Sequence, residues 1–433
     1  MRDILATLGT QTEQAEVYTI ESESTAIQFE ANEMKAAAVE ETQGIALRAI
    51  VDGRLGFTAA SGRVVEAELI DNLLASARYG DHVPLVLPAA SPAPEVEVYD
   101  AGLAEVPIAR FVKIGREIIA ALREVDEDAH VYVNIERTVG KATLCNTAGA
   151  EICDRYTAFS VGISVERVRG DDVLMVYDSV DDVSFGESYR QAVDRLANKI
   201  AAAKRSARLT SGRMPVLFSP TGAMVLGLPI MLAINGENVQ RGVSPLSDKV
   251  GQKVFDAQLT LWDDPTIPGR PSSSSYDDEG VPCRRKALLS RGVCEGFVFD
   301  LKTAALMGCE STGNGARSLF SPPSPSPTNL ILEPGETPLA EMLAGIERGL
   351  LVEHVLGLGQ GNAMSGAFSN TLGLAYVIEK GEIVGRVKDV SIAGNIYEDL
   401  REVAALSRES YWVYGHLKLP YILLPELNVV CKG

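Results

Sequence analysis

The sequence has few histidines and no long apolar run. Only four of its 433 residues are histidine, the side chain that binds metals most often in proteins. No stretch approaches the roughly 20 consecutive apolar residues that a membrane-spanning helix needs. The first residues also lack the apolar core of a secretory signal. We therefore expect a cytoplasmic protein without a membrane partner.

Basic residues are outnumbered as well. The sequence has 40 lysines and arginines against 58 aspartates and glutamates, which gives a net charge of −18. Affinity for nucleic acid comes chiefly from clustered basic side chains that neutralise phosphates. No basic stripe with interleaved aromatic residues is present. We therefore expect no nucleic-acid partner.

The six cysteines are spread along the chain without a C-x-x-C pair. This pattern indicates neither a disulfide framework nor a zinc ribbon. We predict that all of them are free thiols: Cys145, Cys153, Cys283, Cys294, Cys309 and Cys431.

Length and composition indicate more than one domain. A chain of 433 residues with 46% apolar composition can bury a large core, and such chains usually divide. We place the boundary near Ser211-Gly212, after a helical pattern that ends in a basic cluster. The predicted domains are residues 1–210, an N-terminal α+β unit, and residues 211–433, a β-rich unit.

In the first half, short alternating runs predict strands, and apolar residues at helical spacing predict helices. Asp52-Gly53 is the signal of a tight hairpin. The predicted strands are 15–21, 25–30, 37–41, 45–51, 55–59, 131–139, 142–146 and 157–167. The predicted helices are 65–77, 111–125 and 188–206.

In the second half we predict a strand at 215–219, an apolar segment at 223–234 and a hairpin that turns at Gly381. The proline-rich run at 321–327 cannot form a helix or a central strand, so we expect an extended surface loop. A helix is predicted at 338–349, with Thr337 as its cap and Pro338 in its first turn.

A catalytic zinc site of the peptidase type needs two histidines and a carboxylate on one helical face. The four histidines, at 82, 130, 354 and 416, are too far apart for H-E-x-x-H or H-E-x-x-x-H. Glu353-His354 fits an inverted motif only if residue 350 is histidine, and it is Leu350. We interpret His354 as a structural or solvated residue.

Three other motifs are incomplete. Gly357, Gly359 and Gly361 lack the third glycine of a dinucleotide fingerprint, because Asn362 occupies its position, so we predict a flexible turn. Ser365 has alanines where a nucleophile elbow has glycines. The acidic run 277–279 has the oxygen ligands of a hard-cation site, but the residues favour a solvated turn that ends at Gly280.

Several segments together resemble the PmbA/TldD family, the so-called modulators of DNA gyrase. Residues 44–58 are similar to its G-x-x-x-R…G-R-x-G-F signature, 277–281 to its D-x-E-G-V element and 311–314 to its S-T-G-N segment. Further matches follow in family order at 329–335, 365–369, 378–381 and 392–395. The resemblance covers nearly the whole chain and is closest to the PmbA (TldE)-like members.

The resemblance implies an α+β fold of two domains, with mixed and antiparallel sheets. TldD-like members carry H-E-x-x-x-H on a helix early in the second domain. The matching positions here lack both histidines and the glutamate: Leu228, Pro229, Ile230, Met231, Leu232 and Ala233. Other groove or motif positions that the resemblance suggests are Asp278, Glu279, Gly280, Thr312, Gly313 and Asn314.

We therefore expect a non-catalytic, PmbA-like subunit that binds no cofactor itself, with zinc held by a TldD-like partner. Its substrate would be an unfolded or peptide-like polypeptide. The alternative is a homodimeric peptide-binding or scaffold protein, in which the partner is a second copy. A third hypothesis is an unusual metallopeptidase site built from Asp277, Asp278, Glu279 and a distant histidine. Whether this chain is itself an enzyme stays open at this stage.

Overall fold

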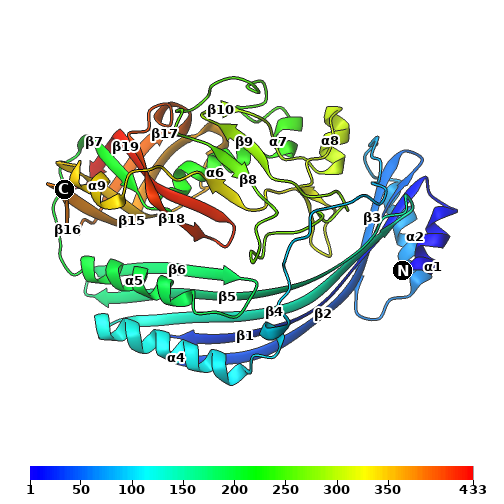
Figure 1. Ribbon diagram of the computed structural model, residues 1–433, viewed down its shortest axis with the longest axis horizontal. Coiled ribbons are helices and arrows are strands. Elements are labelled where there is room, and N and C mark those ends of the chain that lie inside the picture. The colour runs from blue at the N-terminus through cyan, green and yellow to red at the C-terminus, as the bar shows by residue number, and fades with distance from the viewer. Residues whose placement is uncertain (433) are drawn as a thin grey trace.

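A computed structural model describes residues 1–432 as two sheets with helices packed against them. Figure 1 shows a long curved sheet, formed by the first half of the chain, beneath a second and more compact sheet system. The α+β class with antiparallel and mixed sheets, predicted above, is confirmed.

The first sheet has six strands in the order β3-β2-β1-β4-β5-β6, and every pairing is antiparallel. Its longest strands reach 19 residues. The strands are β1 (Gln14–Glu30), β2 (Glu33–Val51), β3 (Arg54–Ser61), β4 (His130–Asn146), β5 (Glu151–Arg169) and β6 (Asp172–Asp182).

Several short strands predicted from the sequence are parts of longer ones. The runs at 15–21 and 25–30 both belong to β1, and those at 37–41 and 45–51 to β2. The polar residues that separate the runs continue the strands, because the middle of the sheet is exposed to solvent. A polar side chain on this exposed part of the sheet therefore does not mark the end of a strand. The tight turn at Asp52-Gly53 is confirmed, and both residues have positive φ, 51° and 70°.

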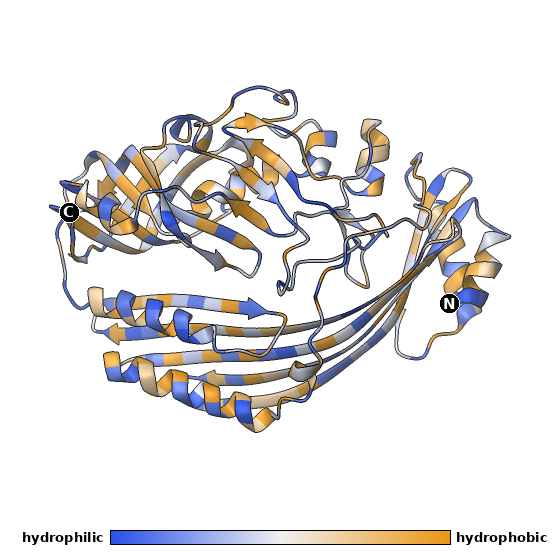
Figure 2. Cartoon of the chain, viewed as in Figure 1, coloured by the Kyte–Doolittle hydropathy of each residue, from blue (hydrophilic) through white to orange (hydrophobic). Residues whose placement is uncertain are grey.

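Two helical layers cover the ends of this sheet and leave its middle bare. At one end α4 (Ile108–Val125) and α5 (Tyr189–Ala202) pack on Ile27, Phe29 and Phe159. At the other end α1 (Arg2–Gly9) and α2 (Glu66–Ala77) pack on Val17 and Leu47. Figure 2 shows hydrophilic and hydrophobic bands alternating along these strands. A short α3 (Ala101–Ala104) lies on the segment that leads to α4.

The second half forms an eleven-stranded mixed sheet, in which β7 pairs parallel with β14 and β13 pairs parallel with β19. Its strands are β7 (Gly212–Phe218), β8 (Leu261–Asp263), β9 (Lys286–Ser290), β10 (Val293–Cys294), β13 (Leu330–Leu332), β14 (Arg348–Val355), β15 (Ala367–Glu379), β16 (Glu382–Arg386), β17 (Val390–Asn395), β18 (Ala405–Val413) and β19 (Leu417–Cys431). The largest apolar core lies in this half.

Short helices fill the connections of the second half. They are α6 (Met224–Ala233), α7 (Gly236–Gln240), α8 (Leu301–Met307), α9 (Leu339–Ala344), η1 (Ala363–Ser365) and α10 (Ile396–Asp399). The helix predicted at 338–349 is too long, since α9 ends at Ala344 and β14 starts at Arg348. Pairing in the sheet replaces the last residues of the predicted helix, because Arg348 and Gly349 pair with Glu379 and Ile378 of β15. Its cap position is Pro338 rather than Thr337.

The proline-rich run at 321–327 is extended, but it is not entirely a surface loop. Pro323 and Pro325 are buried, and β12 (Ser324–Pro325) pairs with β11 (Gly315–Ala316). All six cysteines are free thiols. Within residues 1–432, no helix combines the length and apolar character that crossing a bilayer would require.

Candidate functional site

The segment that corresponds to the zinc motif lies on α6, directly after β7. The helix continues through Pro229, which is buried, and its last residue, Ala233, is fully buried. Leu228, Ile230 and Leu232 are half-buried. The helix therefore presents apolar side chains at its accessible surface, at the positions where the resemblance places the zinc ligands of TldD-like proteins.

A cavity of about 470 Å³ lies beside α6. Leu228 and Pro229 form one wall, the glycine-rich turn around Gly357 and Gly359 forms another, and the start of β15 forms the third. Both glycines have positive φ, as a tight turn requires. No acidic, basic, histidine or cysteine side chain lines this cavity. Its walls thus offer neither metal ligands of the usual zinc type nor a general acid or base.

The acidic turn at 277–280 lies elsewhere, against the first sheet, and the prediction of a solvated turn is wrong. Glu279 is fully buried and Asp277 is half-buried. Oδ1 of Asp277 accepts from the amides of Glu279 and Val281 at 3.0 and 2.9 Å, and its Oδ2 accepts from the amide of Gly315 at 2.9 Å. Burial, together with the nearby charge of Glu279, raises the pKa of Asp277 to about 8.

Glu279 belongs to a buried ion-pair network that joins the two halves of the chain. Arg48, on β2, donates to Glu279 at 2.5 Å and to Glu16, on β1, at 2.8 Å. Arg317 forms a second ion pair with Glu16 at 2.6 Å. These four side chains are at most 2% exposed. Burial alone would raise the pKa of Glu16, but Arg317 and Arg48 outweigh it and hold that pKa below its usual value.

This network occupies the carboxylates that a cation site would need. The second oxygen of Glu279 accepts from the amide of Leu301 at 2.6 Å, and Asp278 accepts from the amide of Arg317 at 2.9 Å. Among residues 1–432, no three histidine, cysteine, aspartate or glutamate side chains are grouped so that they could hold a metal ion. The arrangement is that of a structural joint between the halves.

The segment 312–314 lies next to the same joint. Asn314 is buried; its amide donates to Asp263 at 2.8 Å, and its carbonyl accepts from Lys286 and Thr312 at 2.8 Å each. Gly313 has a φ of 71°, and a Cβ there would lie 2.8 Å from the carbonyl oxygen of Pro282. The structure therefore brings 278–280 and 312–314 together, and none of these residues lines the cavity beside α6.

His354 occupies a partly buried position on β14. Its ring packs edge-on against Tyr177 with centroids 4.9 Å apart, and its Nδ1 has no hydrogen-bond partner within residues 1–432. Burial, reinforced by the charge of Lys199, lowers the pKa of His354. A neutral histidine that packs against an aromatic ring fits the structural interpretation made from the sequence.

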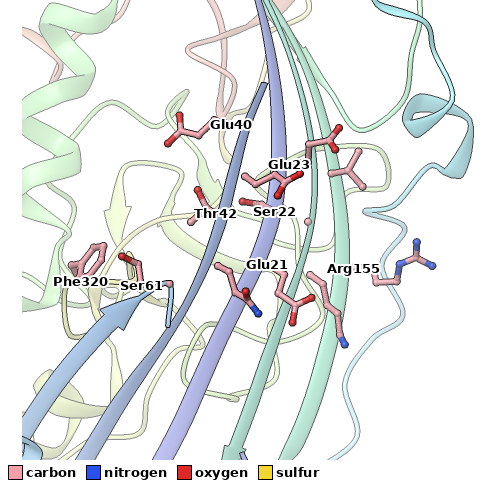
Figure 3. Close-up of a pocket in the computed structure, with 14 residues that line it drawn as sticks. Glu21, Ser22, Glu23, Glu40, Thr42, Ser61, Arg155 and Phe320 are labelled. Atoms are coloured by element: carbon pink, nitrogen blue, oxygen red, sulfur yellow. The ribbon is translucent and has the colours of Figure 1, made fainter. Parts of the chain in front are cut away.

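A cavity of about 910 Å³ forms an open groove on the first sheet where β3 ends (Figure 3). Its lining comes from all of the first five strands and from Phe320, which is 62% exposed. Polar side chains predominate: Ser22, Thr42 and Ser61 line it together with Glu21, Glu23, Glu40, Glu41, Lys141 and Arg155.

The groove adjoins an open strand edge. β3 pairs with β2 only from Gly44 onward, so residues 33–43 of β2 have β1 as their one sheet neighbour in the described chain. Nearly all of this stretch is exposed. An unpaired edge presents a row of backbone donors and acceptors that another extended chain can use.

Sequence reasoning missed Glu16, Arg317 and the groove. Glu16 lies between Ala15 and Val17 near the start of the run 15–21, and a charge beside apolar residues of a strand can indicate a buried ion pair. Arg317 carries no comparable signal, because only the fold brings it to Glu16. The groove depends on where β3 stops relative to β2, which the sequence does not indicate.

Three family profiles match the chain in succession. Residues 15–78 match the PmbA/TldA metallopeptidase domain 1, residues 102–204 its central domain and residues 211–431 its C-terminal domain. These matches cover both sheets, the acidic turn and α6.

Solved structures show the same fold. TldE from Thermococcus kodakarensis superposes with a TM-score of 0.91 at 25% identity, covering 99% of both chains. A Thermotoga maritima protein, provisionally described as a modulator of a DNA gyrase, gives a TM-score of 0.90 at 24% identity, again over 99% of both chains.

Some relatives match almost the whole chain in sequence, and others match only about half of it. An uncharacterised Methanocaldococcus jannaschii protein is 26% identical over 407 residues, which is 91% of each chain. A Haemophilus influenzae protein named as a metalloprotease TldD homolog is 29% identical over 232 residues, and that match spans 51% of this chain and 48% of the relative.

Proposed function

The chain belongs to the PmbA/TldD metallopeptidase family, and from that premise we propose that it is a subunit that binds no catalytic zinc and completes a peptidase formed with a zinc-bearing, TldD-like relative. The observation that carries this proposal is the apolar α6 with its adjoining cavity, which no ionisable side chain lines. Zinc, where the relative supplies it, activates a water molecule for attack on a peptide bond.

The contribution of this chain is to hold an extended polypeptide. The open edge of β2 at 33–43 can add a strand through main-chain hydrogen bonds, which favours binding with little dependence on sequence. The groove of about 910 Å³ at the end of this edge gives room for the side chains of such a segment. Both features suit an unfolded or peptide-like substrate.

Reconstitution tests the subunit role. The purified chain, the zinc-bearing relative and their equimolar mixture are each assayed on an unfolded, carboxymethylated protein. We expect no cleavage by this chain alone and a rise in cleavage when the two are mixed. If mixing changes neither the cleavage activity of the relative nor the mass of the assembly it forms, the proposal is overturned and a homodimeric scaffold is favoured.

Hydrogen–deuterium exchange tests the binding surface separately. The unfolded protein is added to this chain without its partner, and amide protection is measured along β2. We expect slower exchange at 33–43. Residues 159–166 of β5, which pair with both β4 and β6 and do not line the groove, are the internal control. Unchanged exchange at 33–43 under saturating substrate would remove this edge from the proposal.

A further inference from the structure

A second polar cavity lies between the two halves, away from α6 and from the groove on the first sheet. It has a volume of about 580 Å³ and shares no lining residue with either of those sites. One wall is formed by β6 and the start of α5, the opposite wall by β18, β19 and Ile331 of β13, and the loop 267–270 closes one side.

Two positively charged side chains line one part of this cavity, and some of their nitrogen atoms donate no hydrogen bond to the described chain. Arg270 is 8% exposed and stacks on Trp412, with its Cζ 4.2 Å from the ring centroid. It donates to the carbonyl oxygen of Gly415, but its Nη1 is 3.6 Å from Asp182 and its Nε has no partner within residues 1–432. Burial lowers the pKa of Arg270, although Asp182 and Asp181 oppose the shift.

Lys418 supplies the second cation. It lies opposite Trp412 in the β18–β19 pairing and beside Ile331 in the β13–β19 pairing, so the three residues share one end of the wall. Its Nζ is 5.9 Å from the Trp412 ring centroid. The described chain provides no ion pair to this ammonium group, since no carboxylate oxygen lies within 4.0 Å.

The opposite wall carries an unpaired carboxylate. Asp181, on β6, is half-buried and has neither an ion pair nor a side-chain hydrogen bond within residues 1–432. Burial raises its pKa, with Asp182 adding to the shift and Arg270 opposing it. Asp181 and Lys418 thus line one cavity with opposite charges that do not neutralise each other.

A zwitterion satisfies both charges at once. Burying charges without partners costs free energy, so a ligand that pairs with each of them is favoured. A polyanion would meet Asp181 and Asp182, and a polycation would meet Arg270 and Lys418, whereas a neutral molecule with one ammonium and one carboxylate meets a partner at each end. Ile267, Ile331 and Trp412 supply apolar and aromatic surface for its side chain.

We propose that this cavity binds a free amino acid or short peptide as a zwitterion, with its ammonium group at Asp181 and its carboxylate at Lys418 and Arg270. Because the Nε of Arg270 is enclosed, Nη1, which lies 3.6 Å from Asp182, is the donor that Arg270 can offer to the carboxylate beside Lys418. Such ligands are small enough for about 580 Å³.

Calorimetric titration of the full-length chain, without partner or zinc, tests this assignment. The probes are the dipeptide Ala-Leu, its N-acetylated form and its C-terminal amide. We expect the free dipeptide to bind and each cap to weaken binding by at least about tenfold, because each removes one charge-assisted interaction. Equal affinity for the free and capped dipeptides, or no heat from the free dipeptide at millimolar concentration, would overturn the proposal.

Substitutions assign the ends of the ligand. Asp181→Asn should lower the affinity for the free dipeptide about tenfold but leave the affinity for the acetylated form unchanged. Lys418→Gln should likewise lower the affinity for the free dipeptide about tenfold but leave the affinity for the C-terminal amide unchanged. Asp171→Asn and Lys253→Gln, at exposed positions that do not line the cavity, are the matched controls. Melting curves verify folding, and the capped probes test the proposal on the unsubstituted chain. Dipeptide affinity that survives both cavity substitutions would contradict it.

Discussion

Arg48 and Glu279 are separated by 231 positions in the sequence and form a buried 2.5 Å ion pair, with side chains only 2% and 0% exposed. Arg48 belongs to the first sheet and Glu279 to the acidic turn of the second half. Two short motifs that define the family resemblance are therefore halves of one contact. The contact fixes how the second half sits over the curved sheet.

Removing Arg48 should destabilise the protein strongly. Arg48→Ala leaves Glu16 and Glu279 buried without this partner, and breaking a buried ion pair in this way costs about 3–5 kcal/mol. Arg213→Ala, which breaks an exposed pair with Glu426, is the control and should cost less than about 1 kcal/mol. Urea unfolding measures both. Equal small losses would show that the network does not hold the halves together.

Two leucines of α6 should respond differently to truncation. Leu226 is 1% exposed and packs in the main core, whereas Leu228 is half-buried beside the cavity. Leu226→Ala should lower the free energy of unfolding by about 2–5 kcal/mol, because truncating a fully buried leucine leaves a cavity in the core. Leu228→Ala should lower it by less than about 1.5 kcal/mol, since less apolar area is lost.

The same leucine pair separates stability from assembly. If the surface of α6 faces the zinc-bearing relative or its substrate, Leu228→Ala should reduce the stimulation of cleavage in the reconstituted mixture more than its small effect on folding explains. Stimulation by the Leu228 variant that equals that of the unsubstituted chain would place this surface outside the assembly.

His354 should make stability fall on mild acidification. Its pKa is lowered in the folded protein, so the unfolded chain takes up the proton first as the pH falls. The stability that the neutral ring contributes is present above the unfolded pKa of about 6.5 and is lost as the pH falls towards the folded value. Thermal melts between pH 7.5 and 5.5 should show a steeper decline for the native chain than for His354→Leu. Parallel curves would contradict this.

The sequence predicts most of the elements and little of what joins them. The Asp52-Gly53 hairpin and the hairpin at Gly381 are confirmed, because local turn chemistry determines them. Strand lengths were underestimated where β1 and β2 cross the bare middle of the sheet, since the polar residues there do not interrupt pairing. The helix predicted at 338–349 is too long, because α9 ends at Ala344 and residues 348 and 349 already belong to β14.

The acidic turn shows the limit most clearly. The residues 277–279 have the composition of a solvated turn. They can be buried only because Arg48 and Arg317, from other segments of the chain, donate hydrogen bonds to Glu279 and Asp278. An acidic composition indicates that burying these side chains would cost free energy, but it does not show which basic residue pairs with them in the fold. The zinc motif is the opposite case, because the absence of its histidines can be read directly from 228–233.

Native mass spectrometry combined with metal analysis tests the central claim most directly, namely that this chain contributes structure rather than zinc to a PmbA/TldD peptidase. The chain is measured alone and after mixing with its zinc-bearing relative. The account predicts no stoichiometric zinc on the isolated chain, and a mixed complex that contains one zinc per zinc-bearing subunit. One tightly bound zinc per isolated chain, retained after dialysis against a chelator, would contradict it.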